Sequence, residues 1–528
     1  MTSRGHFTRS LFAAVVVGLM ALAPHAAVRA DDDAIAAADA ALGRWDVATA
    51  NRELADADEG PAKQVKLGMI AIYEGRYADA EQVLAEAIAA GSLDGTDALA
   101  EEARHYLALA RGAQKALGAA ITLTSTDGHV TAVFADAKDA LLAPYLFDAM
   151  AKAREVLGVE LGVLPDHAVR FEFLDDPAKL AMVTPLTVAN IRTTGTVGVT
   201  KHRRVVMVTP RIMVHGYGWL DTAVHEYVHY LLTLRTGNLA PVWLQEGLAK
   251  LYEARWRRET PEPLAPPVAF RLHQAIVRDD LVTLEEMYPS VAMLPSAELA
   301  ALAYAEVETM LALLRERRGT EGITILLDRV LAGDDAKTAL ATAWGDDFDA
   351  FYTEWKRVTK TRTAKGREGE IDTPKFKEGE IDPDEIGDVF SELGGGKARQ
   401  HARLGALLQS RGHLEASAMQ YEKARAADAR ARRDPTLSRR LGKLYVELER
   451  WGEAVALLEI AAADEPDDAN LAAAQTRALL RAGQRAAALE AADRTLRNNP
   501  FVPTIHCDLA ELATDKAIVE RERGLCRP

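Results

Sequence analysis

The sequence predicts a mainly α-helical chain in which helical repeats flank a smaller α+β domain. Three observations indicate this: alanine is abundant while aromatic residues make up only 6% of the chain, two regions repeat a helical pattern, and β-branched runs gather in one central region. Alanine has the best intrinsic helix propensity. At roughly 100–200 residues per domain, a chain of 528 residues suggests three or four domains.

Residues 1–30 have the features of a secretory signal peptide. Arg4 and Arg9 precede the apolar run LFAAVVVGLMALA, and Val28 and Ala30 supply the small residues of a cleavage site. The run is too short to span a bilayer comfortably, and no cysteine follows it as a bacterial lipoprotein would require. We therefore expect an exported protein, in the periplasm or otherwise secreted, with no membrane span in the mature chain.

A helical pattern recurs in residues 31–117. ALGRWDVATANREL and YEGRYADAEQVLAEAI each combine a small residue, a bulky aromatic residue and alanines at helical spacing. Gly43 and Gly75 hold equivalent places, 32 residues apart. The period resembles that of the tetratricopeptide repeat, in which a unit of about 34 residues forms two antiparallel helices.

Residues 118–358 predict one α+β domain. Its first part, 118–210, contains four short β-branched or alternating runs bounded by turn residues: AAITLTST, HAVRFEFL, GTVGVT and RVVMVTP. The run LAPYLFDAMAKAREVLGVELG between the first two has helical period. Its second part, 211–358, is helical and closes with the amphipathic run DFDAFYTEWKRVTK.

Residues 359–397 predict a flexible linker, because they are rich in charge and glycine and repeat GEID. Residues 398–528 return to the helical repeat pattern, with RGHLEASAMQYEKA, LERWGEAVALLEIA and RAGQRAAALEAADR as successive units. These units align on Ala416, Ala454 and Ala487. Stacked units of this kind form a superhelix with a concave face, and an undifferentiated helical bundle is the alternative.

Charge and cysteine content narrow the partners and the compartment. The net charge of -15 would repel nucleic acid, so we expect no such partner. The two cysteines, Cys507 and Cys526, are expected to form a disulfide in an oxidising compartment, worth on the order of 3 kcal/mol. The alternative is two unrelated thiols.

The run WLDTAVHEYVHYLLTLRTGNLAPVWLQEGLAKLYEARW, residues 219–256, carries the pattern of a metal site. His225 and His229 are four residues apart, so on a helix they share one face and can bind one metal ion. Glu226 lies about 100° further round the helix, where its carboxylate can take a proton from water beside the metal. The alternative is a helix with two satisfied core histidines.

A third ligand is expected from the next helix. The turn signal RTGNLAP follows His229, and an antiparallel return would bring Glu246 over the two histidines. Glu246 is the only carboxylate between His229 and Glu253, and Glu253 shares its face and can orient a ligand histidine. Two histidines and a carboxylate are typical of catalytic zinc, so we expect one zinc ion per chain, although nickel or cobalt fit the same ligands.

HEYVH followed by WLQEGLA resembles the gluzincin superfamily, the zinc peptidases that include thermolysin and the aminopeptidase N group. It is most similar to the peptidase MA-like domains of bacterial secreted proteins, which are often fused to tetratricopeptide repeats. The resemblance covers roughly residues 118–358. It implies that His225, His229 and Glu246 bind zinc and that Glu226 is the general base.

The resemblance also implies further roles. Glu253 lies on the helix that would place it beside a ligand histidine, and RVVMVTP is the candidate for the sheet edge that binds extended substrate. Tyr304, in LAALAYAEVETMLALLRERRG, matches the tyrosine that hydrogen-bonds the oxyanion in many members. The alternative for Tyr304 is a tyrosine packed between helices.

Three departures separate the chain from the best-known members. Sixteen residues separate His229 from Glu246, where the aminopeptidase N group has eighteen, and the G-x-M-E-N run is absent. Lys250 replaces the aspartate of thermolysin-type enzymes. Outside the motif, His215 can line the cleft or be a loop residue, and His202 in KHRR is expected in a solvated charge run.

The sequence therefore predicts a secreted zinc metallopeptidase, an endopeptidase rather than an aminopeptidase, that hydrolyses peptide bonds with zinc-activated water and Glu226 as base. The repeats would bind a protein partner or position a substrate. One alternative is a repeat scaffold whose metal domain is inactive or structural. Another is a zinc hydrolase acting on a non-peptide amide, such as a cell-wall peptide bridge.

Overall fold

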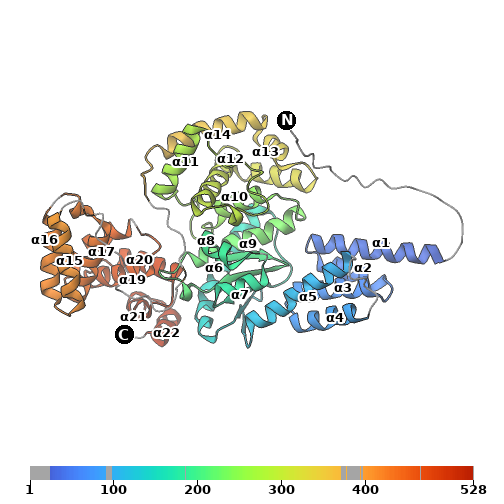
Figure 1. Cartoon of the computed structure of the whole chain (residues 1–528), viewed down its shortest axis with the longest axis horizontal. Helices are drawn as coiled ribbons and strands as arrows, with labels where there is room; N and C mark the ends of the chain where they lie inside the picture. Colours follow the sequence, from blue (N-terminus) through green and yellow to red (C-terminus); the bar gives the residue numbers. More distant parts are fainter. Residues whose placement is uncertain are drawn as a thin grey trace, which may run out of the picture.

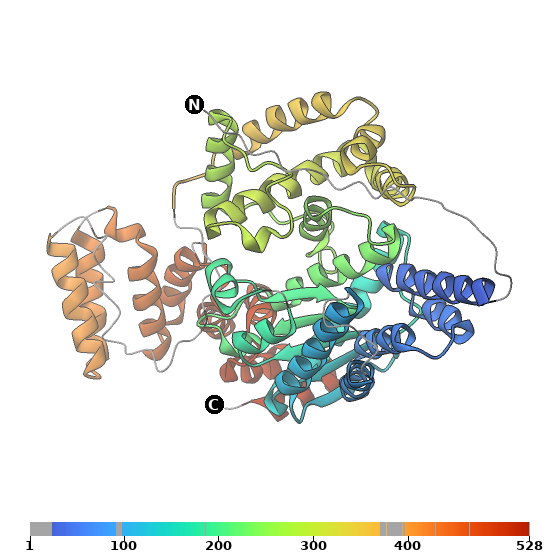
Figure 2. The ribbon, with the colours of Figure 1, turned by 45° about the vertical axis from the view of Figure 1, so that its right-hand side comes forward.

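The computed structural model describes residues 24–90, 98–184, 186–369, 376, 393, 396–427, 429–463 and 465–526. Figure 1 shows N-terminal helices on one side, a central domain built on one sheet, and C-terminal helices on the other side. Figure 2 shows the same three parts turned by 45°, with the last helices against the central domain. The predicted fold class, mainly helical with one small sheet, is confirmed.

The N-terminal part is a stack of packed helices. Their bounds are α1 Pro24–Gly43, α2 Val47–Asp56, α3 Pro61–Tyr73, α4 Tyr77–Ala89 and α5 Ala98–Leu117. Small residues let the helices approach closely, since a side chain at Gly68 would collide with Leu84. The turn between α3 and α4 uses the left-handed φ of +74° at Gly75. Residues 1–23 of the expected signal peptide lie outside the described residues, and residues 24–30 begin α1.

The central sheet has five strands in the order β1-β2-β3-β5-β4. Their bounds are β1 Ile121–Thr124, β2 Val130–Phe134, β3 Val169–Leu174, β4 Gly198–Lys201 and β5 Arg204–Val208. The strands β2, β3 and β5 are parallel neighbours, whereas β1 and β4 pair antiparallel at the two edges. The sequence identified every one of these strands except β2, a short apolar run that periodicity alone does not assign.

The expectation that RVVMVTP forms the sheet edge is wrong. The strand β5 in this run lies between β3 and β4 and is buried at every position, whereas β4 forms the edge. A continuous apolar run such as VVMV is typical of a strand that is covered on both faces. The run GVTK of β4 is half-buried and polar at its end, as an edge strand requires.

The rest of the central domain is helical. The bounds of its helices are η1 Ala137–Leu142, α6 Ala143–Leu161, α7 Pro177–Val183, α8 Val188–Thr194, η2 Pro210–Ile212, α9 Trp219–Thr236, α10 Val242–Tyr252, α11 Pro266–Arg278, η3 Val291–Met293, α12 Ala297–Leu331, α13 Ala336–Trp344 and α14 Phe348–Thr363. The helices α11, α13 and α14 pack with α12 in a group apart from the sheet (Figure 1). The helix α12 breaks at Gly319, whose φ is +62°. The helix α9 packs against β4, β5, α6 and α10, so it lies at the centre of the domain.

The N-terminal helices cover the turn between β4 and β5. The expectation that His202 is solvated is wrong, because only 7% of it is exposed. Its ring lies 5.7 Å from the ring of Tyr73 and 5.6 Å from that of Tyr106, which come from α3 and α5. The charge run KHRR was misread because its neighbours come from helices far away in the sequence.

A buried ion pair joins the N-terminal helices to the sheet. Arg204 of β5 donates to Glu172 of β3 at 3.1 Å and also to the hydroxyl of Tyr77 of α4. Arg170 donates to the same carboxylate at 2.6 Å. Because Arg204 and Glu172 are each only 1% exposed, losing Glu172 would leave the buried charge of Arg204 without its carboxylate partner.

The C-terminal part consists of paired helices. Their bounds are α15 Gly396–Ser410, α16 Leu414–Ala427, η4 Ala431–Arg433, α17 Pro435–Glu447, α18 Trp451–Ala462, α19 Ala469–Arg481, α20 Arg485–Asn498, α21 Pro503–Leu512 and α22 Lys516–Leu525. Asp434, Asp468 and Asp515 cap the first turns of α17, α19 and α22 through their side chains. The three units recognised in the sequence correspond to α15–α16, α17–α18 and α19–α20, and α21–α22 adds a further pair.

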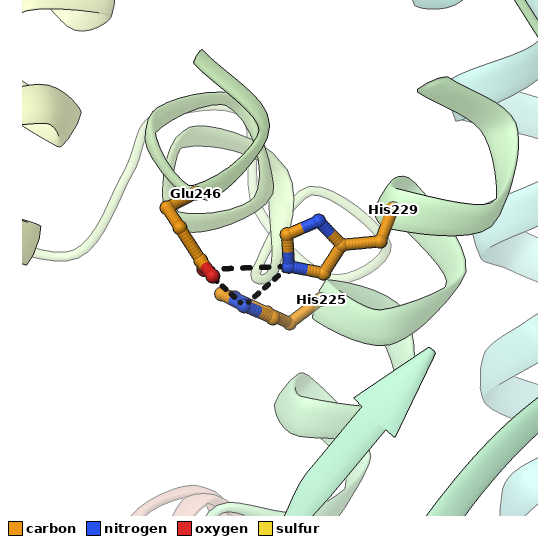
Figure 3. A group of neighbouring side chains, drawn as sticks. All are labelled: His225, His229 and Glu246. Carbon is orange, nitrogen blue, oxygen red and sulfur yellow. Dashed lines mark hydrogen bonds and ion pairs between the residues drawn. The ribbon is translucent and has the colours of Figure 1, made fainter. Parts of the chain in front are cut away.

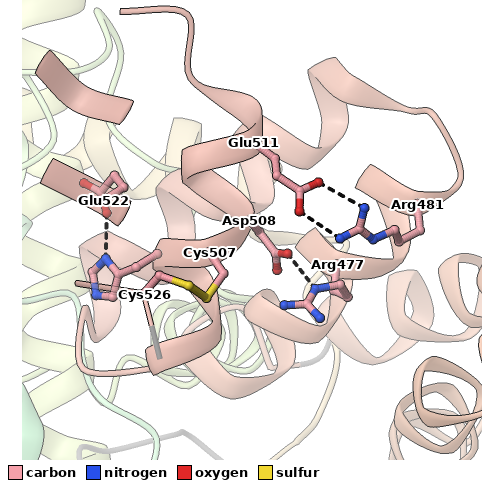
Figure 4. The surroundings of a disulfide bond; sticks show 8 residues. Arg477, Arg481, Cys507, Asp508, Glu511, Glu522 and Cys526 are labelled. Atoms are coloured by element: carbon pink, nitrogen blue, oxygen red, sulfur yellow. Dashed lines mark hydrogen bonds and ion pairs between the residues drawn. A yellow bond between two sulfur atoms is a disulfide. The ribbon is translucent and has the colours of Figure 1, made fainter. Parts of the chain in front are cut away.

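The end of the chain is fastened by a disulfide and a buried carboxylate (Figure 4). Cys507 and Cys526 are joined in a disulfide. Glu522 of α22 is fully buried, accepts a hydrogen bond from the hydroxyl of Tyr145 of α6 at 2.9 Å, and pairs with His506 at 2.6 Å. The terminal helix pair is therefore anchored to the central domain.

The C-terminal helices also hold the segment that leads into α9. The backbone N–H of Tyr217 donates to the carbonyl of Asn498 at 3.0 Å, and the indole N–H of Trp219 donates to the carbonyl of Leu496 at 2.9 Å. His215 pairs with Asp468 at 3.4 Å. These contacts fix the start of α9 from the repeat side.

Part of the expected linker is ordered against the central domain. The helix α14 continues to Thr363, beyond the boundary placed at residue 358, because Val358, Thr359 and Thr363 extend its buried face. Phe376 forms an antiparallel bridge with Met213. Residues 370–375, 377–392, 394 and 395 of the expected linker lie outside the described residues.

Glu306 of α12 is an ionisable group buried in the helical part of the central domain. It is 2% exposed and accepts a hydrogen bond from the backbone N–H of Val282 at 3.0 Å. Burial raises its pKa to about 8 despite that hydrogen bond. An unfolded chain ionises this carboxyl near pH 4.5, so the folded state loses stability through it as the pH rises from there toward 8.

Glu306→Gln keeps an acceptor for Val282 but cannot ionise. We expect the variant to be more stable than the wild type at pH 8, by at least about 1 kcal/mol or roughly 2–4 °C in Tm. At pH 4.5 the gain should vanish, because the carboxyl is then protonated in the folded state. Thermal unfolding at the two pH values measures this, and an equal gain at both would contradict it.

Candidate metal centre

The helix α9, Trp219–Thr236, presents two imidazoles to one point. His225 and His229 lie one turn apart, and their Nε2 atoms are 3.2 Å from each other. The helix ends at Gly237, whose φ of +61° provides the left-handed cap that turns the chain back. The expected antiparallel return therefore begins where the sequence placed it.

Glu246 reaches the two histidines from α10, Val242–Tyr252 (Figure 3). Its Oε2 lies 3.4 Å from Nε2 of His225 and 3.3 Å from Nε2 of His229. The three side chains are 12–15% exposed. They form the cluster of potential metal ligands found among the described residues.

The donor set fits a tetrahedral metal ion. Histidine nitrogens and carboxylate oxygens bind zinc at about 2.0–2.2 Å, so two tetrahedral ligands stand about 3.3–3.5 Å apart. The observed separations of 3.2, 3.3 and 3.4 Å lie within about 0.1 Å of this range. Glu246 Oε2 is buried and makes no hydrogen bond; it has only the two imidazole nitrogens beside it at ion-pair distance.

The carboxylates of Glu246 and Glu253 make the surroundings of His225 strongly negative. Burial alone would lower the pKa of His225, but the facing carboxylates of Glu246 and Glu253 outweigh burial and raise it to about 10. Burial likewise opposes the ionisation of Glu246, yet the two imidazoles lower its pKa. A divalent cation among the three side chains would compensate this negative charge.

Glu253 contacts His225 at the ring nitrogen that does not face Glu246. Its Oε2 lies 3.1 Å from Nδ1 of His225, on the side of the ring away from Glu246. Lys250 donates to the other oxygen of Glu253 at 2.5 Å. Lys250 thus binds the carboxylate that contacts His225.

Glu226 lies beside the ligand group. It is 6% exposed, and its Oε2 accepts a hydrogen bond from the hydroxyl of Thr200 in β4 at 2.7 Å. The base expected from the sequence is therefore packed between α9 and the edge strand. Nothing in the sequence pattern pointed to Thr200, because the pairing of β4 with α9 is a tertiary contact.

Tyr304 comes from α12 and lies near the same carboxylates. Burial raises the pKa of its phenol, and the negative charges of Glu246, Glu226 and Glu253 raise it further. The phenol therefore remains a hydrogen-bond donor at neutral pH.

Two further titratable residues are relevant: Glu308 lies near the candidate ligands, and His215 does not. The sequence did not single out Glu308, which interacts electrostatically with Lys250, Glu253 and His225, and whose pKa burial raises to about 7. The only signal for it was its position four residues after Tyr304 on the same helix. His215 pairs with Asp468 of the C-terminal helices instead of joining the ligands.

Comparison with known families places the site in a recognisable domain. Residues 174–361 match the model of the Peptidase MA superfamily. The match begins at the last residue of β3 and contains β4, β5, α9, α10 and α12. It therefore includes the three candidate ligands, Glu226 and Thr200, and it indicates a peptidase domain.

Comparisons of the whole chain add little. No curated protein matches it. The solved structure "Crystal structure of APC/C hetero-tetramer Cut9-Hcn1" aligns at 12% identity over 94% of this chain and 92% of that chain, with a TM-score of 0.21. A TM-score this low carries no argument about this fold. Among the described residues, no helix combines the length and apolar character needed to cross a bilayer.

Metal analysis of purified protein tests the ligand set. We expect about one equivalent of divalent metal per wild-type chain and a loss of it in His229→Ala and in Glu246→Gln, since each removes one of three protein ligands. His413→Ala changes an exposed histidine in the turn between α15 and α16; it is the matched control and should keep the metal. Equal metal content in His229→Ala and wild type would contradict the assignment.

The contact behind His225 gives a second prediction. Glu253→Gln should weaken metal binding about 10–100-fold without abolishing it, because the residue orients a ligand and is not one. Competition with a chromogenic chelator measures the affinity. An unchanged affinity would mean that Glu253 does not support His225.

Proposed function

We propose that the chain is an exported zinc metallopeptidase with endopeptidase activity. The observation that carries the proposal is the group of three facing ligand atoms, with Glu246 Oε2 buried and lacking a hydrogen bond, next to a glutamate on the same helix. The match to the Peptidase MA superfamily supports peptide bonds as the substrate class.

Each residue of the site would have a separate role in the proposed reaction. His225, His229 and Glu246 would hold the metal, and Glu253 with Lys250 would keep His225 in its orientation. A bound zinc ion would polarise the substrate carbonyl and make a water molecule more acidic.

Glu226 would take a proton from the attacking water and return it to the leaving amine. Tyr304 would donate its phenol hydrogen to the oxygen that gains negative charge during the attack. Its closeness to the charges of Glu246, Glu226 and Glu253 supports this role.

Two sequence features extend the proposal to specificity and compartment. The absence of a G-x-M-E-N run, which recognises a free substrate amine in aminopeptidases, favours cleavage within chains. The signal-peptide features of residues 1–30 and the disulfide between Cys507 and Cys526 favour an oxidising compartment, which we take to be the periplasm. The helix pairs on both sides would bind a protein partner or present substrate.

The second candidate function is a scaffold, in which the helix pairs bind a partner and the metal domain is structural. The extent of the helical parts favours it, since they flank the central domain on both sides. The two functions differ in one respect: partner binding by a scaffold would survive substitution of Glu226.

Glu226→Gln separates the two. We expect the variant to retain its metal while kcat on unfolded casein and on a quenched peptide library falls by about 10²–10⁴-fold, the usual contribution of a general base. Glu259→Gln, an exposed glutamate just after α10, is the matched control and should keep wild-type activity.

Equal cleavage by Glu226→Gln and the wild type would contradict the base assignment. Metal in both proteins with cleavage in neither would favour the scaffold.

A further inference from the structure

The edge strand β4 turns one face toward the candidate base. Residues 198 and 200 lie on the same face because side chains alternate along a strand. The hydroxyl of Thr200 lies 2.7 Å from Oε2 and 2.8 Å from the backbone carbonyl of Glu226. A threonine hydroxyl has one hydrogen, so it donates to one of these acceptors at a time, and the charged oxygen makes the stronger bond.

Gly198 occupies the other side of the same carboxylate. A Cβ at this position would lie 2.9 Å from Oε1 of Glu226 and 3.1 Å from its Cγ. The φ of Gly198 is outside the left-handed region, so space and not backbone conformation calls for glycine here. Glu226 is thus held by a hydrogen bond at one oxygen and closely packed at the other.

The strand that carries both residues is itself fixed. β4 pairs with β5, with Thr200 opposite Val205, and the turn that follows it buries His202 among the N-terminal helices. This edge strand is held at its tip by helices distant in sequence. Thr200 therefore has a defined place from which to act on Glu226.

We propose that Thr200 and Gly198 are positioning residues for the general base. The inference rests on the proposed function, since it takes Glu226 as that base. With Oε2 bound to Thr200, Oε1 is the oxygen left to accept the proton of the attacking water and to pass it to the leaving amine. Thr200 neither gains nor loses a proton; it selects one rotamer of a long and otherwise adaptable side chain.

Kinetics of matched variants test the proposal. Thr200→Val keeps the shape but removes the donor, so kcat should fall about 10–100-fold while KM stays within about twofold of wild type. Thr200→Ser restores the donor and should recover most of the loss. Thr196→Val removes a hydroxyl that contacts Thr194 instead of Glu226, and it should behave as wild type.

Crystal structures of the same variants give a readout that needs no activity. Glu226 should keep one conformation in Thr200→Ser and in Thr196→Val, and should leave that position or split between rotamers in Thr200→Val. Gly198→Ala is an independent variant that should displace Oε1 by crowding it. If Glu226 stays unmoved in both Thr200→Val and Gly198→Ala, the proposal is overturned.

The two readouts separate the failure of this inference from that of the proposed function. If the variants displace Glu226 but the wild type cleaves no peptide, the contact between Thr200 and Glu226 is supported and the peptidase function is contradicted. If the wild type cleaves peptides and Thr200→Val does so with the same kcat, the positioning role alone is overturned.

Discussion

One constraint organises this structure: two imidazole nitrogens and one carboxylate oxygen stand within 3.4 Å of one another in a largely buried site. A buried carboxylate oxygen without a hydrogen bond, here Oε2 of Glu246, is costly unless a cation compensates it. Such an arrangement lasts only if the two helices that carry the groups are rigid. The central position of α9, packed on the sheet and on α6 and α10, meets this requirement.

The flanking helices contribute to that rigidity from opposite sides. The C-terminal pairs bind the backbone and indole groups at the start of α9 through Asn498 and Leu496. The N-terminal helices bury the β4–β5 turn through Tyr73 and Tyr106, and so fix the strand that contacts Glu226. Both groups of helices therefore contribute to the structure of the central domain.

Local pattern in the sequence was enough to predict the helical regions, four of the five strands and the three side chains that meet at the candidate metal centre. Spacing of four places His225 and His229 on one helix face, and a glycine-marked turn returns Glu246, so short-range geometry sufficed. What failed were tertiary contacts. β5 was read as an edge and His202 as solvated, because strand order and the helices covering the β4–β5 turn depend on segments distant in sequence. Thr200 escaped notice for the same reason.

The most direct measurement is anomalous diffraction from crystals of the full mature chain, collected on both sides of the zinc absorption edge. The account predicts one strong peak that appears only above the edge and lies between Nε2 of His225, Nε2 of His229 and Oε2 of Glu246. A well-ordered site without such a peak, in protein purified without chelators and supplied with zinc, would contradict the central claim.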